Sequence, residues 1–261
     1  MTNLVPAVLS IAGSDSGGGA GIQADLKAFA RCRVHGMTAI TAITVQNTVG
    51  VQGVDAVAPG TIVAQVRAVA EDIGVDAVKI GMLGTTETVD AVVAALGHVG
   101  GAPVVIDPVM VAESGAVLLD DEARAALIER LLPLATVATP NIPEARVLTG
   151  LGEGASQEEL VRSVVGLGPR AVVVTGGHSE ELVDLFFDGE QLVEIPGERH
   201  PDGAAHGSGC THSSALAAFL ARGAEPLEAA RRAREIASEA VGNGLRDVGR
   251  GPGPVDVFGL E

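Results

Sequence analysis

A run of small residues, in the order Gly207, Ser208, Gly209 and Cys210, leads directly into an alanine-rich stretch. Small residues at a helix N-terminus present free backbone N–H groups to an anion, and the helix dipole there lowers the pKa of a thiol. The plain structural alternative is helix capping by Ser208 beside a small buried Cys, but capping needs only one such residue. The pattern therefore predicts an anion hole with a reactive thiol.

A second glycine-rich segment covers residues 12–21, AGSDSGGGAG. Its glycines allow backbone N–H groups to approach a ligand closely, and the next helix offers its positive N-terminal end. The segment is not a dinucleotide fingerprint, because position 22 is Ile, and not a P-loop, because neither Lys27 nor Lys79 follows a glycine. Taken alone, it is equally well explained as a tight turn.

Two carboxylates complete the set of residues that could do chemistry. Asp107 follows the apolar run 104–106, and Glu144 comes three residues after Asn141. Such a pair suits Mg²⁺, which takes one or two carboxylates together with phosphate oxygens. Helix capping for Asp107 and dipole matching for Glu144 are structural alternatives, each favoured when taken singly. Beside two phosphate-type loops, however, the carboxylates favour phosphoryl transfer from a nucleotide.

Two other classes of function stay open at this point. Acyl transfer with Cys210 as a covalent nucleophile usually needs a His base held by a third group. His212 lies two residues into the expected helix and is expected to point away from position 210. A nucleotide-binding sensor without chemistry would keep the glycines but would have no need of Cys210.

Composition excludes several classes of partner. The chain has 261 residues with 17 Lys+Arg against 33 Asp+Glu, a net charge of −16, and it has no Trp or Tyr. This balance argues against a nucleic-acid groove. No apolar run approaches the ~18 residues needed to span a membrane. The first basic residue is Lys27, so no signal peptide is recognisable, and we expect a cytoplasmic protein with Cys32 and Cys210 reduced.

Val- and Ile-rich runs alternate with helical periods along the whole chain. Strands are expected at 7–11, 38–45, 77–80, 104–106, 136–139 and 171–174, and helices at 21–31, 60–73, 85–96, 121–132, 157–165, 209–221 and 226–245. An antiparallel hairpin is expected over 182–187 and 191–195, around Asp188-Gly189. The pattern predicts an α/β protein, a single three-layer α/β/α domain over residues 1–261 with a mostly parallel sheet. The glycine-rich loop after the first strand, Asp107 and Asn141 all follow strands, where such sheets bind ligands.

At these residues the chain resembles the hydroxymethylpyrimidine/phosphomethylpyrimidine kinases of thiamine biosynthesis, in the ribokinase superfamily. The matching stretches are 12–15, 18–27, 46–48 (QNT), 79–83 (KIGML), 107–110 (DPVM), 139–145 (TPNIPEA), 176–178 (GGH), 206–211 (HGSGCT) and 249–255. They occur in order and at family-like spacing. The resemblance implies a ribokinase-like fold, ATP and Mg²⁺ as co-substrates and a homodimer. It implies phosphorylation of 4-amino-5-hydroxymethyl-2-methylpyrimidine to its monophosphate and then to its diphosphate.

The resemblance also assigns site residues. It places Gln46 on the aminopyrimidine edge and Met82 and Val109 on the faces of the ring, with Asp15, Gly19 and Ala20 also on the substrate. It makes Cys210 the acceptor of the hydroxyl proton, while the N–H groups of Gly207, Ser208, Gly209 and Cys210 hold the phosphoryl group. Asn141, Thr175 and Gly177 are assigned to ATP, and Asp107 and Glu144 to the metal.

The sequence departs from the family pattern in three places. Thr175 stands where these kinases commonly have Lys, so a positive charge beside the triphosphate is missing. Residues 202–205 replace a more polar approach to His206, and Glu113 adds a negative charge near a phosphate site. Pyridoxal kinase is the alternative within the superfamily, because its substrate also carries a hydroxymethyl group on a small aromatic ring. A non-catalytic nucleotide-binding protein is the alternative from another class.

Overall fold

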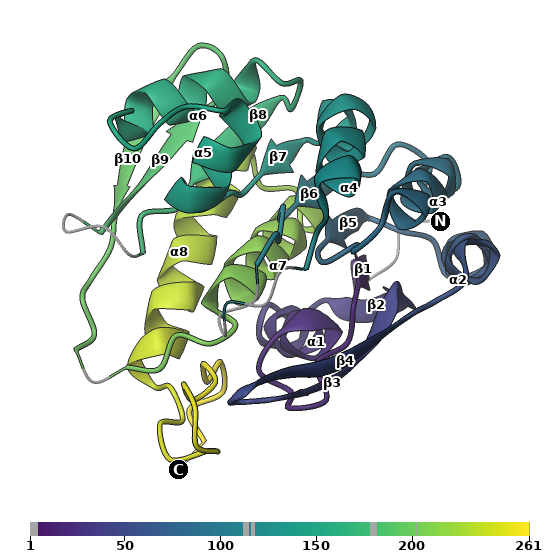
Figure 1. Ribbon diagram of the computed structural model, residues 1–261, viewed down its shortest axis with the longest axis horizontal. Helices are drawn as coiled ribbons and strands as arrows, with labels where there is room; N and C mark the ends of the chain where they lie inside the picture. The colour runs from purple at the N-terminus through teal and green to yellow at the C-terminus, as the bar shows by residue number, and fades with distance from the viewer. Residues whose placement is uncertain (1–4, 112–114, 116–117, 178–181, 202, 261) are drawn as a thin grey trace.

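The computed structural model describes residues 5–111, 115, 118–177, 182–201 and 203–260. Its centre is an eight-stranded sheet with the order β10-β9-β8-β7-β6-β5-β1-β2 (Figure 1). The strands are β1 (Ala7–Ala12), β2 (His35–Ile40), β5 (Ala77–Ile80), β6 (Val104–Ile106), β7 (Val137–Ala138), β8 (Ala171–Val174), β9 (Val183–Phe187) and β10 (Leu192–Pro196). All neighbours pair in parallel except those of β9, so the expected hairpin is confirmed.

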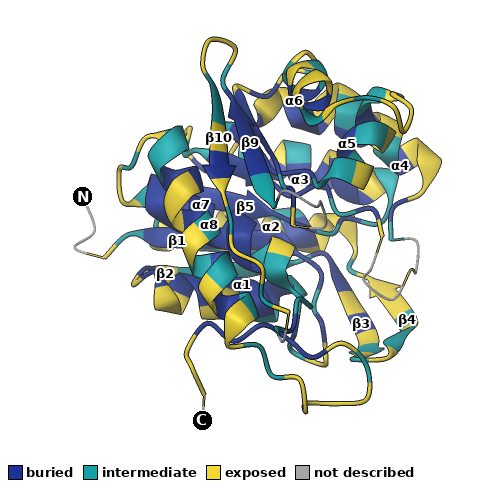
Figure 2. Ribbon diagram, turned by 90° about the vertical axis from the view of Figure 1, so that its left-hand side faces the viewer, coloured by how far each residue is buried: buried dark blue, intermediate teal, exposed yellow. Residues whose placement is uncertain are grey.

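Helices cover both faces of the sheet. One face packs against α1 (Gly21–Arg31), α7 (Ser208–Ala221) and α8 (Pro226–Gly242), and the other against α2 (Pro59–Asp72), α3 (Thr86–Leu96), α4 (Asp121–Ala126), α5 (Ile142–Thr149) and α6 (Gln157–Val165). Successive strand residues alternate between the layers: Val8 packs on the α7 side and Leu9 on the other. Both layers are therefore apolar, and in Figure 2 the strands are mostly buried. The expected three-layer α/β/α arrangement with a mostly parallel sheet is confirmed.

A small second sheet corrects one expectation. The strand expected over 38–45 is two strands in different sheets, since β2 ends at Ile40 and pairs with β1, whereas β3 (Ala42–Asn47) pairs with β4 (Gly50–Ala56). Thr41 separates them, its N–H donating to the Ala12 carbonyl. Nothing in this continuous run of Thr, Ala, Ile and Val residues marks such a change of partner. β4 was not expected, because Gly50, Gly53 and Asp55 are poor strand formers.

Three helical segments also differ from expectation. The helix expected over 121–132 is α-helical only to Ala126, then continues as a π-helical turn, Leu127–Leu131, and a 3-10 turn, Leu132–Leu134. Pro133 lies in this last turn and has no N–H with which to extend an α-helix. Helix α5 was not expected, and α8 ends at Gly242 rather than at residue 245. Among the described residues, no helix is long and apolar enough to cross a membrane.

The chain passes from β1 to its neighbour β2 and later to β5 on the other side of β1. Such a change of direction opens a crevice at the carboxyl ends of the strands. The residues that follow β1, β5, β6, β7 and β8 meet along this edge. The topology therefore brings the glycine-rich loop, Met82, Asp107, Asn141 and Thr175 to one place.

Candidate active site

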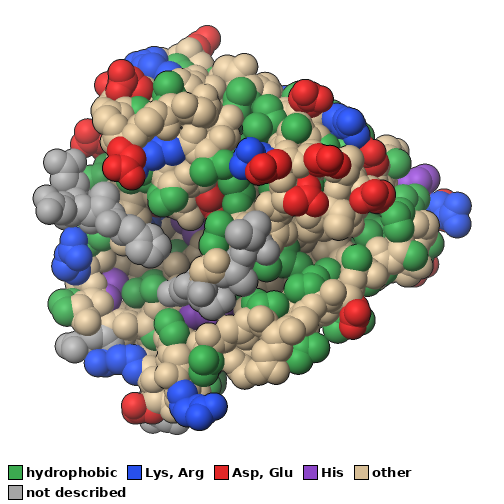
Figure 3. All heavy atoms as spheres, in the orientation of Figure 1, with side chains coloured by type: hydrophobic (Ala, Val, Ile, Leu, Met, Phe, Trp, Pro, Cys, Tyr) green, Lys and Arg blue, Asp and Glu red, His purple; other side chains and the backbone are tan. Residues whose placement is uncertain are grey.

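A cavity of about 600 Å³ lies at this carboxyl edge. Figure 3 shows the molecule hollowed near the centre of one face, with histidine side chains visible in the hollow. Of the residues expected to form the site, all but Gly19 line it: Asp15, Ala20, Gln46, Met82, Asp107, Val109, Asn141, Glu144, Thr175, Gly177, Gly207, Ser208, Gly209 and Cys210. The structure therefore brings together segments that span most of the chain.

The N-terminus of α7 forms the expected anion hole in part. Gly207 is the N-cap, in the left-handed region at φ 87°, and Ser208 makes no side-chain cap, so capping by Ser208 does not explain the motif. Within the described part of the chain, the N–H groups of Gly209 and Cys210 have no acceptor. The Ser208 N–H donates to the Ala205 carbonyl, 2.9 Å away, so in this structure it is already bonded. The N–H groups of Gly209 and Cys210 are open to an anion.

The Cys210 thiol does not behave as its position on a helix would suggest. Burial raises its pKa to about 12; Lys79 opposes this rise, Asp25 and Asp107 add to it, and the Gly21 N–H donates to the sulfur. The expected lowering by the helix dipole is therefore wrong, because desolvation and two nearby carboxylates outweigh it. Without further positive charge the sulfur is a neutral thiol at neutral pH.

The glycine-rich loop is organised by Asp15, whose side chain is 2 % exposed. Its Oδ1 accepts the Gly17 N–H at 2.7 Å, and its Oδ2 accepts those of Gly19 at 3.0 Å and Ala20 at 2.9 Å. His206 Nε2 lies 3.3 Å from the same Oδ2. Burial opposes ionisation, but these hydrogen bonds, that of His206 foremost, hold the pKa of Asp15 below its ordinary value. Asp15 therefore holds this loop against the segment that contains His206.

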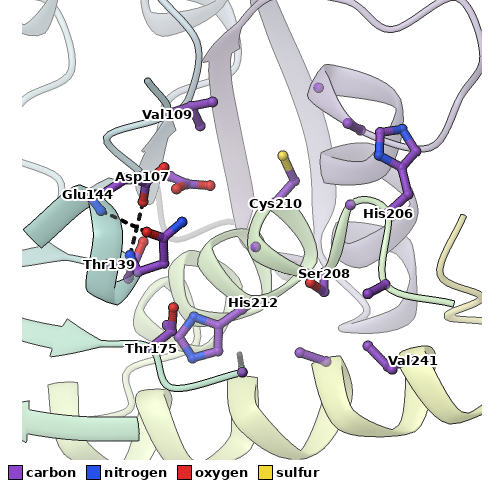
Figure 4. Close-up of a pocket in the computed structure, with 18 of the residues that line it drawn as sticks. Asp107, Val109, Thr139, Glu144, Thr175, His206, Ser208, Cys210, His212 and Val241 are labelled. Atoms are coloured by element: carbon purple, nitrogen blue, oxygen red, sulfur yellow. Dashed lines mark hydrogen bonds between the residues drawn. The ribbon is translucent and has the colours of Figure 1, made fainter. Parts of the chain in front are cut away.

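Glu144 and Asn141 form a capping box at the start of α5. The Glu144 carboxylate accepts the Asn141 N–H at 2.9 Å, and the Asn141 side-chain oxygen accepts the Glu144 N–H at 2.8 Å (Figure 4). Burial, followed by repulsion from Asp107, raises the pKa of Glu144 to about 8, against hydrogen bonds from Asn141 and Met110. Glu144 therefore has a structural role in the first turn of α5, and its raised pKa disfavours the ionised carboxylate.

Asp107 is the second carboxyl at this edge. Ser213 Oγ donates to its Oδ2 at 3.0 Å, while burial raises its pKa against the opposing charge of Lys79. Among the described residues, no group of three or more His, Cys, Asp or Glu side chains is arranged to hold a metal ion. A metal here would need phosphate oxygens and water to complete its ligands.

One part of the cavity lining combines one amide with apolar side chains. Gln46 follows a register shift in β3, and its Oε1 accepts a hydrogen bond from the Thr44 hydroxyl at 3.3 Å. A bulge of this kind re-aims a side chain, which brings Gln46 into the cavity lining beside Met82 and Val109. An amide that donates and accepts, together with apolar walls, suits a flat heteroaromatic ring.

Another part of the cavity lining contains residues that the sequence analysis missed. Asp184 accepts the Gly176 N–H at 2.9 Å, lies 3.4 Å from Arg234 and has His212 Nε2 3.8 Å from its other oxygen. Burial lowers the pKa of His212, so the ring is neutral. From α8, Arg234, Ser238 and Val241 line the cavity at helical spacing, and this period could have identified that face.

A buried network beneath the anion hole was missed as well. Lys79 Nζ lies 2.8 Å from Asp25 Oδ1, and both side chains are 0 % exposed. A charged residue inside the apolar strand AVKI, and another on the apolar face of a helix, were the available signals. Glu113, His178 and Asp202, which the sequence analysis also considered, lie outside the described residues.

A mostly parallel sheet between two helical layers, with two glycine-rich segments and a helix N-terminus at one cavity, is the arrangement expected of a ribokinase-like phosphotransferase. Comparison with known proteins narrows this class. The chain matches the phosphomethylpyrimidine kinase family over residues 15–256 and belongs to that family.

Individual relatives agree with this assignment. The chain is 49 % identical over 256 residues to the hydroxymethylpyrimidine/phosphomethylpyrimidine kinase of Rhizobium meliloti, covering 96 % of each protein. It is 46 % identical over 253 residues to the thiamine biosynthesis bifunctional protein ThiED of Geobacter sulfurreducens, covering 95 % of this chain and 51 % of that longer one. An ADP complex of Bacillus subtilis pyridoxal kinase is 40 % identical, with a TM-score of 0.88 over 96 % of this chain and 97 % of that one. The resemblance, the fold and the kinase class inferred from the sequence are confirmed.

Proposed function

We propose that this chain phosphorylates 4-amino-5-hydroxymethyl-2-methylpyrimidine with ATP and then phosphorylates the monophosphate to the diphosphate, for thiamine biosynthesis. The observation that carries the proposal is one cavity with two unlike sets of lining residues. Gln46, Met82 and Val109 form one set, and Thr175 and Gly177 form the other. Met82 follows β5 and Thr175 follows β8, and β6 and β7 lie between these two strands in the sheet. The N-terminus of α7 also lines this cavity, where it offers N–H donors to the phosphoryl group that is being transferred.

Gln46 recognises the aminopyrimidine edge in this proposal, and Met82 and Val109 clasp the ring. Asp15 and Gly19 act through the loop that they shape, while Ala20 lines the cavity beside the ring. Asn141, Thr175 and Gly177 contact the nucleotide. The ADP complex of the similar Bacillus subtilis kinase supports an adenine nucleotide as the second substrate.

Cys210 receives the proton when the hydroxymethyl oxygen attacks the γ-phosphorus of ATP. The O–P bond forms, the bond from the γ-phosphorus to the bridging oxygen of ADP breaks, and the proton passes from the hydroxyl to the sulfur. This step needs the sulfur as a thiolate, although burial raises the pKa of the Cys210 thiol to about 12. Positive charge close to the sulfur therefore has to accompany the reaction.

Asp107 and Glu144 would hold Mg²⁺, with Asn141 ordering water and phosphate. They fit a cation because both are buried carboxyls with a raised pKa, and Asp107 is among the causes of the rise at Glu144. Mg²⁺ would supply positive charge to the phosphate oxygens and to these two carboxylates.

We further propose that the protein is a homodimer. The β3–β4 hairpin exposes the large apolar side chains Ile43, Val45, Val49 and Val54, each at least half exposed. Such a set on a projecting sheet is typical of a surface that a second chain covers. Sedimentation of the wild type and of an Ile43→Asp/Val45→Asp variant tests the dimer.

The activity is tested by coupled ADP release with hydroxymethylpyrimidine, with its monophosphate and with pyridoxal, side by side on one preparation. We expect turnover with both pyrimidines and a lower kcat/KM for pyridoxal. Pyridoxal is the second candidate substrate because a pyridoxal kinase shares this fold so closely. Preference for pyridoxal would replace the proposed substrate, and ADP release with none of the three would indicate a binding protein.

A further inference from the structure

Lys79 has no role in the site as described so far, yet it is a fully buried cation at the cavity. It lies in β5 with its side chain fully buried and lines the cavity together with Cys210 and Asp107. Burial disfavours its charged form, but Asp25 above all, with Cys210 and Asp107, raises the pKa of Lys79 above its ordinary value. The side chain is therefore a permanent buried cation.

Asp25 holds this cation rigidly. Its Oδ1 accepts Lys79 Nζ at 2.8 Å and the Ser214 hydroxyl at 2.7 Å, and its Oδ2 accepts the Ser10 hydroxyl at 2.6 Å. Three elements, β1, β5 and α7, thus converge on one carboxylate that projects from α1. A buried ion pair is well supported only when hydrogen bonds satisfy its remaining lone pairs, as they do here.

The helical period places Cys210 above this network. Ser213 and Ser214 follow Cys210 by three and four residues on α7, so they share its face of the helix. Ser213 donates to Asp107, and Ser214 donates to Asp25. The second turn of α7, on the same face as Cys210, therefore bonds to two buried carboxylates, one of which holds Lys79.

We propose that Lys79 is a positioning residue of the phosphoryl-transfer centre: held by Asp25, its ammonium stabilises the negative charge that Cys210 carries when it takes the hydroxyl proton. Among the described residues, the charged groups that act on the Cys210 thiol are Lys79 from β5, Asp25 from α1 and Asp107 after β6, and Asp107 in turn acts on Glu144 of α5. Lys79 is the cation among these groups. This inference rests on the proposed role of Cys210, but its test does not require any kinase reaction.

The test uses the rate at which iodoacetamide alkylates Cys210 at about pH 8, because the thiolate is the nucleophile and its fraction sets that rate. Peptide mass spectrometry separates Cys210, which is partly exposed, from the buried Cys32. The variants are Lys79→Met, Asp25→Asn and the pair Lys79→Met/Asp25→Asn. The pair is included because Lys79→Met alone leaves a buried carboxylate without its cation. Ser10→Ala is the matched control, since it removes one hydrogen bond from Asp25 and no charge.

The expected order of alkylation rates is Asp25→Asn fastest, then wild type, then the paired variant, with Lys79→Met slowest. A change of one unit in the thiol pKa alters the rate about tenfold, and we expect at least this loss in Lys79→Met. Ser10→Ala should alkylate at a rate within about twofold of the wild type. In steady-state assays the paired variant should lose kcat in the first phosphorylation more than in the second, with the KM for ATP little changed.

Equal alkylation rates in the wild type and the paired variant, alongside lowered melting temperatures, would show that the ion pair only supports the fold. If Lys79→Met does not fold, Asp25→Asn and the paired variant still decide the order of rates. If the order holds but no pyrimidine is phosphorylated, the proposed function fails and the role of Lys79 stands. If pyrimidines are phosphorylated but the order of alkylation rates fails, the proposed function stands and the role of Lys79 fails.

Discussion

Gly207 offers the sharpest test of how the anion hole is built. It sits at φ 87°, and a Cβ added there would lie 1.8 Å from the carbonyl oxygen of Gly19. Real Cβ contacts are almost never under 3.0 Å, so an alanine would have to displace backbone of the glycine-rich loop by about 1 Å. The two phosphate-type segments are therefore interlocked through this one position.

The size of the effect can be worked out against a matched control at the other end of α7. Gly223 has φ 85°, and an added Cβ there would meet nothing within 4 Å. Gly223→Ala thus bears only the left-handed backbone cost, about 1–2 kcal/mol, partly offset by a stiffer unfolded chain. Gly207→Ala bears that cost together with overpacking of about 1–3 kcal/mol. We expect a loss of about 1 kcal/mol for the control and about 2–5 kcal/mol for Gly207→Ala.

Thermal melting and turnover measure both effects. At about 2–4 °C per kcal/mol for a chain of this size, Gly223→Ala should melt about 3 °C below the wild type and Gly207→Ala about 4–20 °C below it. A shift of about 1 Å in the phosphoryl site costs on the order of 10²-fold in turnover, which should appear in Gly207→Ala and not in Gly223→Ala. Equal melting shifts in the two variants, with turnover retained in both, would refute the interlock.

Three further expectations follow from the site. Cys210→Ala should slow the first phosphorylation by about 10²–10⁴-fold. It should slow the second far less, because the monophosphate is mostly deprotonated at neutral pH and needs no base. Equal losses in the two steady-state rates would mean that Cys210 only shapes the loop. Gln46→Ala should leave the aminopyrimidine edge unpaired and lower kcat/KM about 5–150-fold for both pyrimidines, the equivalent of about 1–3 kcal/mol. A defect confined to ATP would place Gln46 on the nucleotide side. Because the pKa of Glu144 is raised from 4.5 to about 8, the metal-free protein should lose stability as pH rises through that window. Glu144→Gln should flatten this fall in melting temperature, and an unchanged slope would contradict the assignment.

The fold was predictable because burial on both faces of a parallel sheet produces a recognisable hydrophobic pattern in the sequence. Strands such as 77–80 and 171–174 are almost wholly apolar, and the helices between them carry one apolar face. The cavity followed from the same logic, since parallel strands bring the residues after them to one edge. The break at Thr41 was not predictable, because only a partner strand decides where one sheet ends and another begins.

The electrostatics of the site could not be read from local pattern. The rule that a helix N-terminus lowers the pKa of a thiol is correct for an exposed helix, but Cys210 is buried and feels the charges of Asp25 and Asp107, which lie 185 and 103 positions earlier in the sequence. Lys79 and Asp25 are likewise 54 positions apart. Their pairing exists only once α1 and β5 are packed against α7. Charges that act through space require the fold before their effect can be assigned.

These pKa directions impose an order on the chemistry. In the free protein Asp107 and Glu144 hold protons more tightly than usual, and so does Cys210. A cation held by Asp107 and Glu144 would favour the ionised form of both carboxyls. With the charge of Asp107 offset in this way, that of Lys79 would act on the Cys210 sulfur with less opposition. In the proposed mechanism Cys210 would then stay a neutral thiol in the empty site, where a thiolate would be open to oxidation or alkylation.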